Sequence, residues 1–457
     1  MSLIEVNFQS DTVRNIQPLH GMNSGPMTKV FTYDARPLFV RAGFPYARLH
    51  DVEYPYGSGE FVDIPCIFRN FDADETREEN YNFALTDVYL EKCMEVGCEP
   101  LFRLGVSIEH APVKRHVFPP KDFFKWARIC EHIIRHYTEG WANGYTWNIR
   151  YWEIWNEADN CARGGTNMWC GTPDQFYELY CVSASHLKKC FPHLKIGGCG
   201  YTRGVNSFTE EFFQYITSRP EPVPLDFYSW HRYTADIENI VTESAKVDGL
   251  LAKYGYTDTE NVFDEWNYMR DWKDQADSYI VLKNHIGAAF CAGVLCSMQT
   301  KTSIHLAAYF EADVVKEWCG IFTVDKMGIG AQKATVAPLK PYYAFEAFNE
   351  LYTMGSEKKV YCDSDTLCAA AASDGERAGL LISNYSDEDT ELELSLFGIP
   401  EGMLEIRLTD EHRDFENVMS IASAGTLRLH FPLSKNAFVY IGSPLRRDTG
   451  LVPQSDL

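Results

Sequence analysis

The sequence lacks three features that would place it in other broad classes of protein. No run approaches the roughly 18 apolar residues that a membrane-spanning helix needs. The fourteen cysteines are scattered singly, with no C-x-x-C pair and no Cys/His spacing typical of zinc sites. Basic side chains are in the minority, 42 against 64 acidic, so the formal net charge is −22. Such a charge repels phosphate backbones and anionic lipids, and we expect neither a nucleic-acid nor a membrane partner.

The cysteines are expected to be reduced core residues, as in a cytoplasmic protein. The first residues, Met1 to Asn7, carry neither the basic nor the apolar region of a secretory leader. The sequence therefore predicts a soluble cytoplasmic protein; the alternative is that a leader has been removed. Cys161 and Cys170 flank a glycine-containing loop, where a disulfide or a reactive thiol is the less favoured alternative to a plain structural role.

We expect no metal and no other cofactor, because His110 and His116 are not at helical ligand spacing. A homo-oligomer is left open. The 457 residues fit a barrel of about 250 residues with insertions plus a smaller companion domain. Aromatic residues make up 14% of the chain. Most of them are expected in the core, but planar rings also stack well on the faces of sugars.

Short β-branched or aromatic runs alternate with longer amphipathic segments from about residue 20 to 354, which is typical of repeated βα units. Eight strands are predicted, the number that closes a parallel barrel. They are Leu19 to Met22, Tyr46 to His50, Pro100 to Leu104, Tyr151 to Asn156, Lys195 to Cys199, Asp226 to Trp230, Asn261 to Asp264, and Ser303 to Tyr309. The fold class is therefore α/β, with a (β/α)₈ TIM barrel over residues 13–354.

The pattern changes after Leu351 to strict alternation, as in Leu392, Leu394 and Leu396, which indicates half-buried antiparallel strands. Turn signals such as Ser373-Asp374-Gly375 divide the segment into short strands. Residues 355–447 are predicted to form a small antiparallel β-sandwich, to which residues 1–12 add a strand. Residues 448–457 are predicted to be a flexible tail.

Two glutamates follow predicted strands of the barrel, whose carboxyl ends carry the active site in this fold. Glu157 ends the run Arg150-Tyr-Trp-Glu-Ile-Trp-Asn-Glu157, and Glu265 ends Asn261-Val-Phe-Asp-Glu265. Hydrolysis of a glycosidic bond requires one carboxylic acid to protonate the leaving oxygen and one carboxylate at the anomeric carbon. The pair therefore indicates a glycoside hydrolase.

The strand before Glu157 is dominated by apolar residues, and this environment favours a protonated acid. Glu157 is therefore predicted to be the acid/base and Glu265 the nucleophile. Alternation along the strand is expected to point Asp264 to the other face. A solvent-facing loop carboxylate is the plain alternative for either glutamate alone, but two at matched strand ends favour catalysis.

The triplet Trp155-Asn156-Glu157 resembles the acid/base signature of clan A glycoside hydrolases, and the order of segments resembles glycoside hydrolase family 39, the β-xylosidase and α-L-iduronidase group. The similarity covers nearly the whole chain. It implies that Asn156 binds the sugar 2-hydroxyl and that His50, in Arg48-Leu-His50-Asp51, contacts the glycone. It also implies that Glu265-Trp266-Asn267 is the nucleophile strand.

In Trp230-His231-Arg-Tyr233 the resemblance implies that His231 and Tyr233 reach the nucleophile. Trp266, Tyr309 and Glu311 are expected to contribute further contacts to the sugar, with barrel packing as the alternative for Tyr309. Lys340-Pro-Tyr-Tyr-Ala-Phe resembles the start of the last barrel helix.

Two segments depart from the pattern of the family. Phe102 to His110 lacks the proline-containing motif of the xylosidases, and Asp159 to Trp169 replaces their loop after the acid/base. Arg103, Glu109 and His110 are therefore candidate specificity residues. The expected function is a retaining, exo-acting hydrolase of short oligosaccharides with a neutral glycone, similar to a β-xylosidase. The alternatives are α-L-arabinosidase or α-L-iduronidase specificity, a non-catalytic carbohydrate-binding barrel, and a metal-dependent isomerase or an aldolase.

Overall fold

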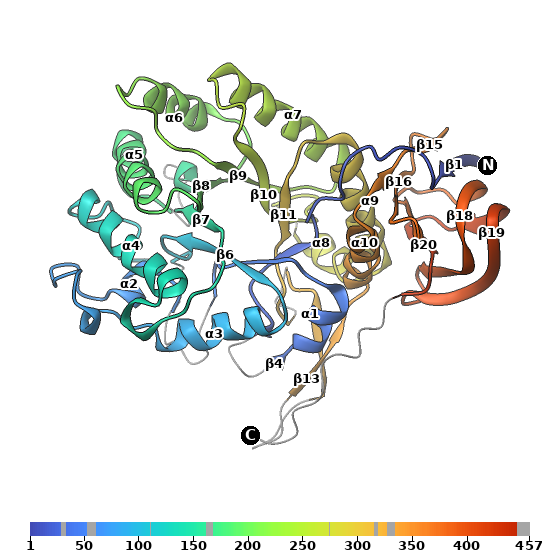
Figure 1. The fold of residues 1–457 in the computed structure, drawn as a ribbon, viewed down its shortest axis with the longest axis horizontal. Coiled ribbons are helices and arrows are strands. Elements are labelled where there is room, and N and C mark those ends of the chain that lie inside the picture. The colour runs from blue at the N-terminus through green and yellow to red at the C-terminus, as the bar shows by residue number, and fades with distance from the viewer. Residues whose placement is uncertain are drawn as a thin grey trace.

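A computed structural model describes residues 1–28, 33–52, 61–109, 111–160, 168–273, 275–314, 319–326 and 334–445. Its centre is a closed barrel of eight parallel strands in the order β2-β5-β6-β7-β8-β9-β10-β11, with β11 returning to β2 (Figure 1). The strands are β2 (Gly21–Asn23), β5 (Tyr46–Arg48), β6 (Glu99–Leu104), β7 (Tyr151–Ile154), β8 (Lys195–Tyr201), β9 (Phe227–Tyr233), β10 (Glu260–Asn267) and β11 (Leu306–Tyr309). Each overlaps one predicted strand, so the predicted TIM barrel is confirmed.

Helices follow the strands and surround the barrel. They are α1 (Arg36–Ala42), α2 (Ile64–Ile67), α3 (Ala84–Glu95), α4 (Phe123–Glu139), α5 (Pro173–Cys190), α6 (Ser207–Thr217), α7 (Ile237–Lys253), α8 (Ala276–Val281), α9 (His285–Lys301) and α10 (Tyr342–Met354). α5 begins with a capping box: Thr172 is the N-cap, Pro173 is the first helical residue, and Gln175 completes the box.

The barrel interior changes from apolar to charged along its axis. Near the amino ends of the strands lies a separate apolar cluster of Tyr46, Leu101, Tyr151, Phe227, Val262 and Leu306. Toward the carboxyl ends come fully buried charged side chains, Arg48, Arg103, Glu153 and Asp264. Buried charges are costly unless they are paired, so this second layer marks the functional end of the barrel.

A small sheet that the sequence analysis did not predict lies beside the barrel, in the order β12-β13-β4-β3. Its strands are β3 (Met27–Thr28), β4 (Tyr33–Asp34), β12 (Phe322–Lys326) and β13 (Ala334–Pro338). They belong to the segments that follow β2 and β11, which are neighbours in the barrel. Strands of two to five residues give too little alternation to be detected by periodicity.

The C-terminal domain is a mostly antiparallel β structure, as predicted. Its strands are β1 (Ser2–Asn7), β14 (Glu357–Lys358), β15 (Val360–Cys362), β16 (Cys368–Ser373), β17 (Ala378–Asn384), β18 (Thr390–Thr409), β19 (Glu416–Leu433) and β20 (Ala437–Gly442). The first half of β18 pairs with β1 and its second half with β20. β1 thus joins the two ends of the described chain in one domain (Figure 1), and its pairing with β18 is parallel.

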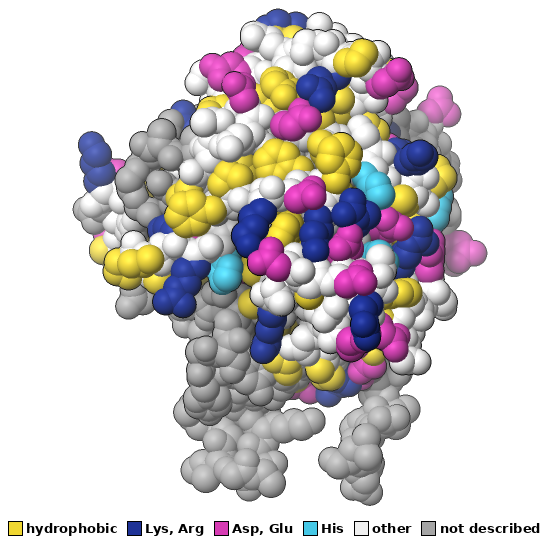
Figure 2. Space-filling model, turned by 90° about the vertical axis from the view of Figure 1, so that its left-hand side faces the viewer, with side chains coloured by type: hydrophobic (Ala, Val, Ile, Leu, Met, Phe, Trp, Pro, Cys, Tyr) yellow, Lys and Arg dark blue, Asp and Glu magenta, His cyan; other side chains and the backbone are white. Residues whose placement is uncertain are grey.

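This domain packs on the outside of the barrel, against α9 and α10. α9 is buried along nearly its whole length because it lies between the barrel and β16, β17 and β20. On the face drawn in Figure 2, Lys and Arg side chains are interspersed with Asp and Glu, and hydrophobic side chains form a band above them. No helix among the described residues combines the length and apolar character needed to cross a bilayer.

Candidate active site

The end of β7 carries the predicted acid/base in a strained backbone. Trp155 and Glu157 have positive φ angles of 72° and 46°, which residues other than glycine rarely adopt. The conformation is held by hydrogen bonds from the Trp155 amide to Leu104 and from the Glu157 amide to Gly200. The Trp155 ring packs against Trp126 of α4. Such strain is concentrated at functional sites, where it fixes side chains that regular geometry would misplace.

The end of β10 contains a β-bulge, and this corrects the prediction made for Asp264. Val262 pairs with Ser229 and Glu265 pairs with His231, so β10 advances three residues while β9 advances two. The extra residue breaks the alternation of side chains. Both Asp264 and Glu265 therefore reach the interior, whereas strict alternation would place them on opposite faces.

Arg48 on β5 connects these two carboxylates with a third. Its guanidinium lies 2.9 Å from Glu265 Oε2, 3.0 Å from Asp264 Oδ2 and 2.8 Å from Glu153 Oε2. It also donates to Asn156 Oδ1 at 2.6 Å. Arg48, Glu153 and Asp264 have no exposed surface. In this dry environment the guanidinium pKa is raised by the surrounding carboxylates in spite of burial, so Arg48 is a fixed positive charge.

The two predicted catalytic glutamates meet on either side of His231. His231 Nδ1 lies 3.0 Å from Glu157 Oε1 and 3.7 Å from Glu265 Oε2. One carboxylate oxygen of each glutamate and one ring nitrogen of His231 all lie within 4.8 Å of one another. A retaining glycosidase requires about 5–5.5 Å between its carboxyl groups, whereas an inverting one requires about 6.5–9.5 Å to hold a water. The spacing therefore fits double displacement.

The surroundings shift the pKa values of Glu157 and His231, at the mouth of the barrel, in opposite directions. Burial, reinforced by the nearby charge of Asp159, raises the pKa of Glu157 to about 8. Burial lowers the pKa of His231 to about 4, so the imidazole is neutral near pH 7. Glu265 accepts hydrogen bonds from Tyr233 at 2.6 Å and from Arg48 at 2.9 Å, and these two donors orient its carboxylate.

Buried polar atoms around the glutamates remain available to a substrate. Asn156 Nδ2 and His50 Nδ1 have no hydrogen-bond partner among the described residues. Buried polar groups are nearly always paired, so orphans at a catalytic site are candidate contacts to sugar hydroxyls. Gly200 borders the same space: a Cβ there would lie 2.8 Å from Arg48 Nη2 and 3.0 Å from His231 Nε2.

The remaining predicted residues at the rim have protein partners. Glu311 is buried after β11 and accepts hydrogen bonds from Ser24 Oγ at 3.2 Å and Cys319 Sγ at 3.3 Å. Arg103 is buried and binds Asp63 at 2.6 Å. Glu109 accepts from the amides of two residues in its own loop. His110 lies outside the described residues.

Trp266 and Tyr309 do not reach the mouth of the barrel, which corrects two predicted sugar contacts. The Trp266 ring lies 6.3 Å from Phe290 of α9 and 6.0 Å from Phe345 of α10, and it is fully buried. Tyr309 packs on the rings of Trp266 and Phe345. The bulge that turns Glu265 inward leaves the next side chain pointing outward, toward the helices.

Arg48 and Glu153 were not predicted from the sequence as functional residues. Both interrupt apolar strands, and a charged residue within a buried strand was the available signal. Cys161 lies outside the described residues, and Cys170, its suggested partner, is a free thiol.

Glu157, His231 and Glu265 also lie close enough together to hold a metal ion. Their chemistry fits hydrolysis better, because both oxygens of Glu265 already accept hydrogen bonds and one of the donors is a fixed cation. A divalent ion would have to displace Tyr233 and lie beside the Arg48 guanidinium.

The TIM barrel with two carboxylates at its carboxyl-terminal end is typical of glycoside hydrolases, and comparison with known proteins gives the family. Residues 39–272 match the family "Glycosyl hydrolases family 39". The chain belongs to glycoside hydrolase family 39.

Individual relatives are distant. A β-xylosidase of Geobacillus stearothermophilus is 27% identical over 206 residues, 43% of this chain and 37% of that protein. A β-xylosidase of Caldicellulosiruptor saccharolyticus is 24% identical over 364 residues, 75% of this chain and 70% of that protein. The chain therefore spans little more than a third of the first relative. A glucosidase structure from Croceicoccus marinus has a TM-score of 0.79 at 23% identity and covers 97% of this chain and 98% of that one.

Proposed function

We propose that the protein is a retaining, exo-acting glycosidase that releases a neutral, xylose-like sugar from short oligosaccharides. The observation that carries the proposal is the approach of one carboxylate oxygen from Glu157 and one from Glu265 to within 4.8 Å across His231. Two carboxyl groups at this separation can act on the same anomeric centre from opposite sides of its bond to the leaving group.

In the first step, Glu265 attacks the anomeric carbon and forms a glycosyl ester as the bond to the leaving oxygen breaks. Glu157 transfers its proton to that oxygen, so the aglycone leaves as a neutral alcohol. A pKa of about 8 keeps Glu157 protonated at neutral pH and ready for this step. Arg48 and Tyr233 orient the attacking carboxylate.

In the second step, Glu157, now ionised, takes a proton from water, and the water oxygen attacks the anomeric carbon. The ester bond breaks, Glu265 leaves as a carboxylate, and the sugar is released with its original configuration. Formation of the ester removes the negative charge of Glu265, which changes the field at Glu157 between the two steps. Neutral His231 separates the two carboxyl groups without adding charge.

Three buried polar groups are proposed to bind the glycone. Asn156 has its oxygen fixed by Arg48, which leaves Nδ2 to donate to the sugar 2-hydroxyl. His50 and Glu311 border the same end of the barrel, after β5 and β11. The choice of a xylose-like glycone rests on the names of the two related β-xylosidases.

The decisive experiment compares alanine variants on an aryl β-xyloside. Glu265→Ala should abolish turnover, and azide should restore part of it with a glycosyl azide of inverted configuration. Glu157→Ala should mainly slow substrates with poor leaving groups, and azide should give the retained configuration. The matched control is Glu238→Ala, which removes an exposed glutamate on α7. Full activity in either active-site variant overturns the assignment.

A panel of nitrophenyl xylosides, glucosides, arabinosides and iduronides identifies the glycone. Release from one of the last three with no release from the xyloside would leave the mechanism standing and correct the substrate. Sugar-dependent thermal stabilisation without release from any of them would favour a non-catalytic binding barrel.

A further inference from the structure

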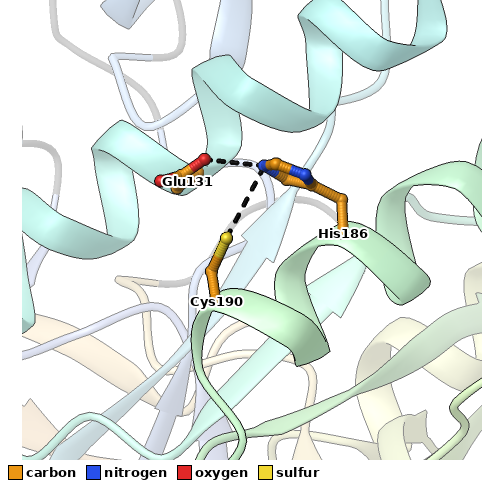
Figure 3. A group of neighbouring side chains, drawn as sticks. All are labelled: Glu131, His186 and Cys190. Carbon is orange, nitrogen blue, oxygen red and sulfur yellow. Dashed lines mark hydrogen bonds and ion pairs between the residues drawn. The ribbon is translucent and has the colours of Figure 1, made fainter.

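A second cluster of reactive side chains lies on the outer helices. Glu131 of α4 and His186 and Cys190 of α5 point toward one another across the gap between these helices (Figure 3). His186 Nε2 lies 2.6 Å from Glu131 Oε2 and 3.8 Å from Cys190 Sγ. All three ligand atoms lie within 4.8 Å of one another. The proposed reaction uses none of them.

We propose that these three residues bind a thiophilic divalent cation, Zn²⁺, between α4 and α5. A thiolate, an imidazole and a carboxylate are the donors that zinc takes in proteins, and three protein ligands leave a fourth position for water. His186 and Cys190 are four residues apart, so successive turns of one helix place them on the same face. This spacing combines one histidine with one cysteine, so it differs from the Cys-x-x-Cys pattern of many zinc sites.

The distances need little adjustment. Ligands at zinc bond lengths around a tetrahedral ion are about 3.4 Å apart for nitrogen and oxygen and about 3.6 Å for nitrogen and sulfur. The His186 to Cys190 distance of 3.8 Å is already close to this value. The His186 to Glu131 distance of 2.6 Å is that of a hydrogen bond, so the carboxylate must retreat by about 0.8 Å as zinc replaces the proton between them.

Arg135 lies beside the three ligand residues and contacts both Glu131 and the thiol of Cys190. It binds Oε1 of Glu131 at 2.8 Å, whereas Oε2 faces His186. This contact orients the carboxylate from the side away from the ion, as outer partners do in metal sites. The Arg135 side chain is 30% exposed and has a second carboxylate partner in Glu139, so it can turn away as positive charge enters. The three ligand residues are half-buried and reachable by solvent ions.

Zinc bound here would link α4 to α5. α4 follows β6 and α5 follows β7, the strand that delivers Glu157. An ion that binds the folded protein and not the unfolded chain raises the free energy of unfolding by mass action. The cation displaces the thiol proton of Cys190, so binding releases a proton and weakens as pH falls.

The test uses the full chain, reduced and free of chelator. Zn²⁺ is titrated against a competing chromophoric chelator, and Co²⁺ serves as a spectroscopic substitute. We expect one ion per chain in this site, a thiolate-to-cobalt charge-transfer band, and a rise in Tm with Zn²⁺. Cys190→Ser and His186→Ala should each weaken binding by more than the roughly 10- to 100-fold that loss of an outer partner costs.

Cys362→Ser is the matched control, because Cys362 is another half-buried free thiol, on β15 of the C-terminal domain. It should leave stoichiometry, affinity and the cobalt band unchanged. The proposal is overturned if the unsubstituted chain gives no charge-transfer band, or if Cys190→Ser binds both ions as well as the Cys362→Ser control does. Because the readouts are binding and Tm, these outcomes are independent of glycosidase activity.

Discussion

Arg48 Nη1 lies 2.9 Å from Oε2 of Glu265, and the arginine has no exposed surface. The same guanidinium binds Glu153 at 2.8 Å, so one side chain both orients the proposed nucleophile and neutralises charge inside the barrel. An arginine suits this task because its planar fork makes several directed hydrogen bonds and stays charged when buried. Catalysis and stability are therefore coupled at Arg48.

Replacing Arg48 with methionine should lower both catalytic activity and stability. Removing one partner of a buried ion pair leaves uncompensated charge, so the free energy of unfolding should fall by about 3–5 kcal/mol. Arg150→Met is the matched control, because Arg150 binds Glu99 with a side chain that is 49% exposed, and a loss of about 0–1 kcal/mol is expected there. Chemical denaturation measures both; equal losses would contradict the coupling.

Tyr233→Phe should separate catalysis from stability. It removes the 2.6 Å hydrogen bond to Glu265 Oε1 and keeps the ring. We expect kcat to fall by about 10²-fold with little change in Tm, since a single donor to a reacting oxygen contributes on this scale. Tyr385→Phe is the control, because its hydroxyl binds a backbone carbonyl, that of Ala235. Undiminished kcat in Tyr233→Phe would show that the hydroxyl does not assist the nucleophile.

The barrel was predictable because its signal is repeated eight times. Each strand, as in Tyr151 to Ile154, is an apolar run followed by a helical pattern, and the closure of eight such units follows from their number. The small sheet that includes β12 was not predicted, because its strands are short and come from separate loops. Which strands pair there depends on contacts distant in sequence.

Less of the site was predictable. Glu157 and Glu265 follow strands and could be located by position, but the orientation of their neighbours depends on backbone irregularity. A bulge in β10 turns Asp264 inward and Trp266 outward, and it leaves no sign in the residue types. Likewise the positive φ of Trp155 is not encoded by a glycine. The backbone departs from regular geometry where the chemistry requires it.

Glu153 and Asp264 should respond differently to amide substitution. Arg48 holds the pKa of Glu153 below its usual value against burial, whereas burial raises the pKa of Asp264 well above its own. Asp264 therefore takes up a proton more readily than Glu153 does. Asp264→Asn should cost less than about 1 kcal/mol, whereas Glu153→Gln removes the charge opposite Arg48 and should cost about 3–5 kcal/mol.

The sign of the pH dependence follows from the raised pKa of Asp264. Between the pKa of a free aspartate, about 3.9, and the higher pKa in the fold, the folded protein binds one more proton than the unfolded chain. This contribution to stability is complete at low pH and is lost as pH rises. Asp264→Asn should therefore gain stability relative to the unsubstituted protein as pH increases. Parallel curves of unfolding free energy against pH would refute the assignment.

Gly200→Ala should damage activity through the positions of neighbouring side chains. Gly200 has a φ of 55°, and an added Cβ would lie 2.8 Å from Arg48 Nη2. Gly255→Ala is a matched control, because Gly255 has a φ of 80° with no atom within 4 Å of the added Cβ. Both variants carry similar backbone strain, but only Gly200→Ala should lose about 10²-fold in kcat, as expected for a displacement near 1 Å. Equal kcat in the two variants would mean that Gly200 is needed only for its backbone conformation and not for the positions of neighbouring side chains.

The basic limb of the pH profile should belong to Glu157. Its pKa of about 8 means that the acid form is full below that value and is lost as pH rises through it. The kcat/KM for a substrate with a poor leaving group should therefore fall above pH 8. His231, with a pKa of about 4, does not titrate in that range. In Glu157→Gln the limb should disappear for an activated aryl glycoside, which needs no proton to leave. A basic limb that persists in this variant near pH 8 would assign the titration, and with it the role of general acid, to another residue.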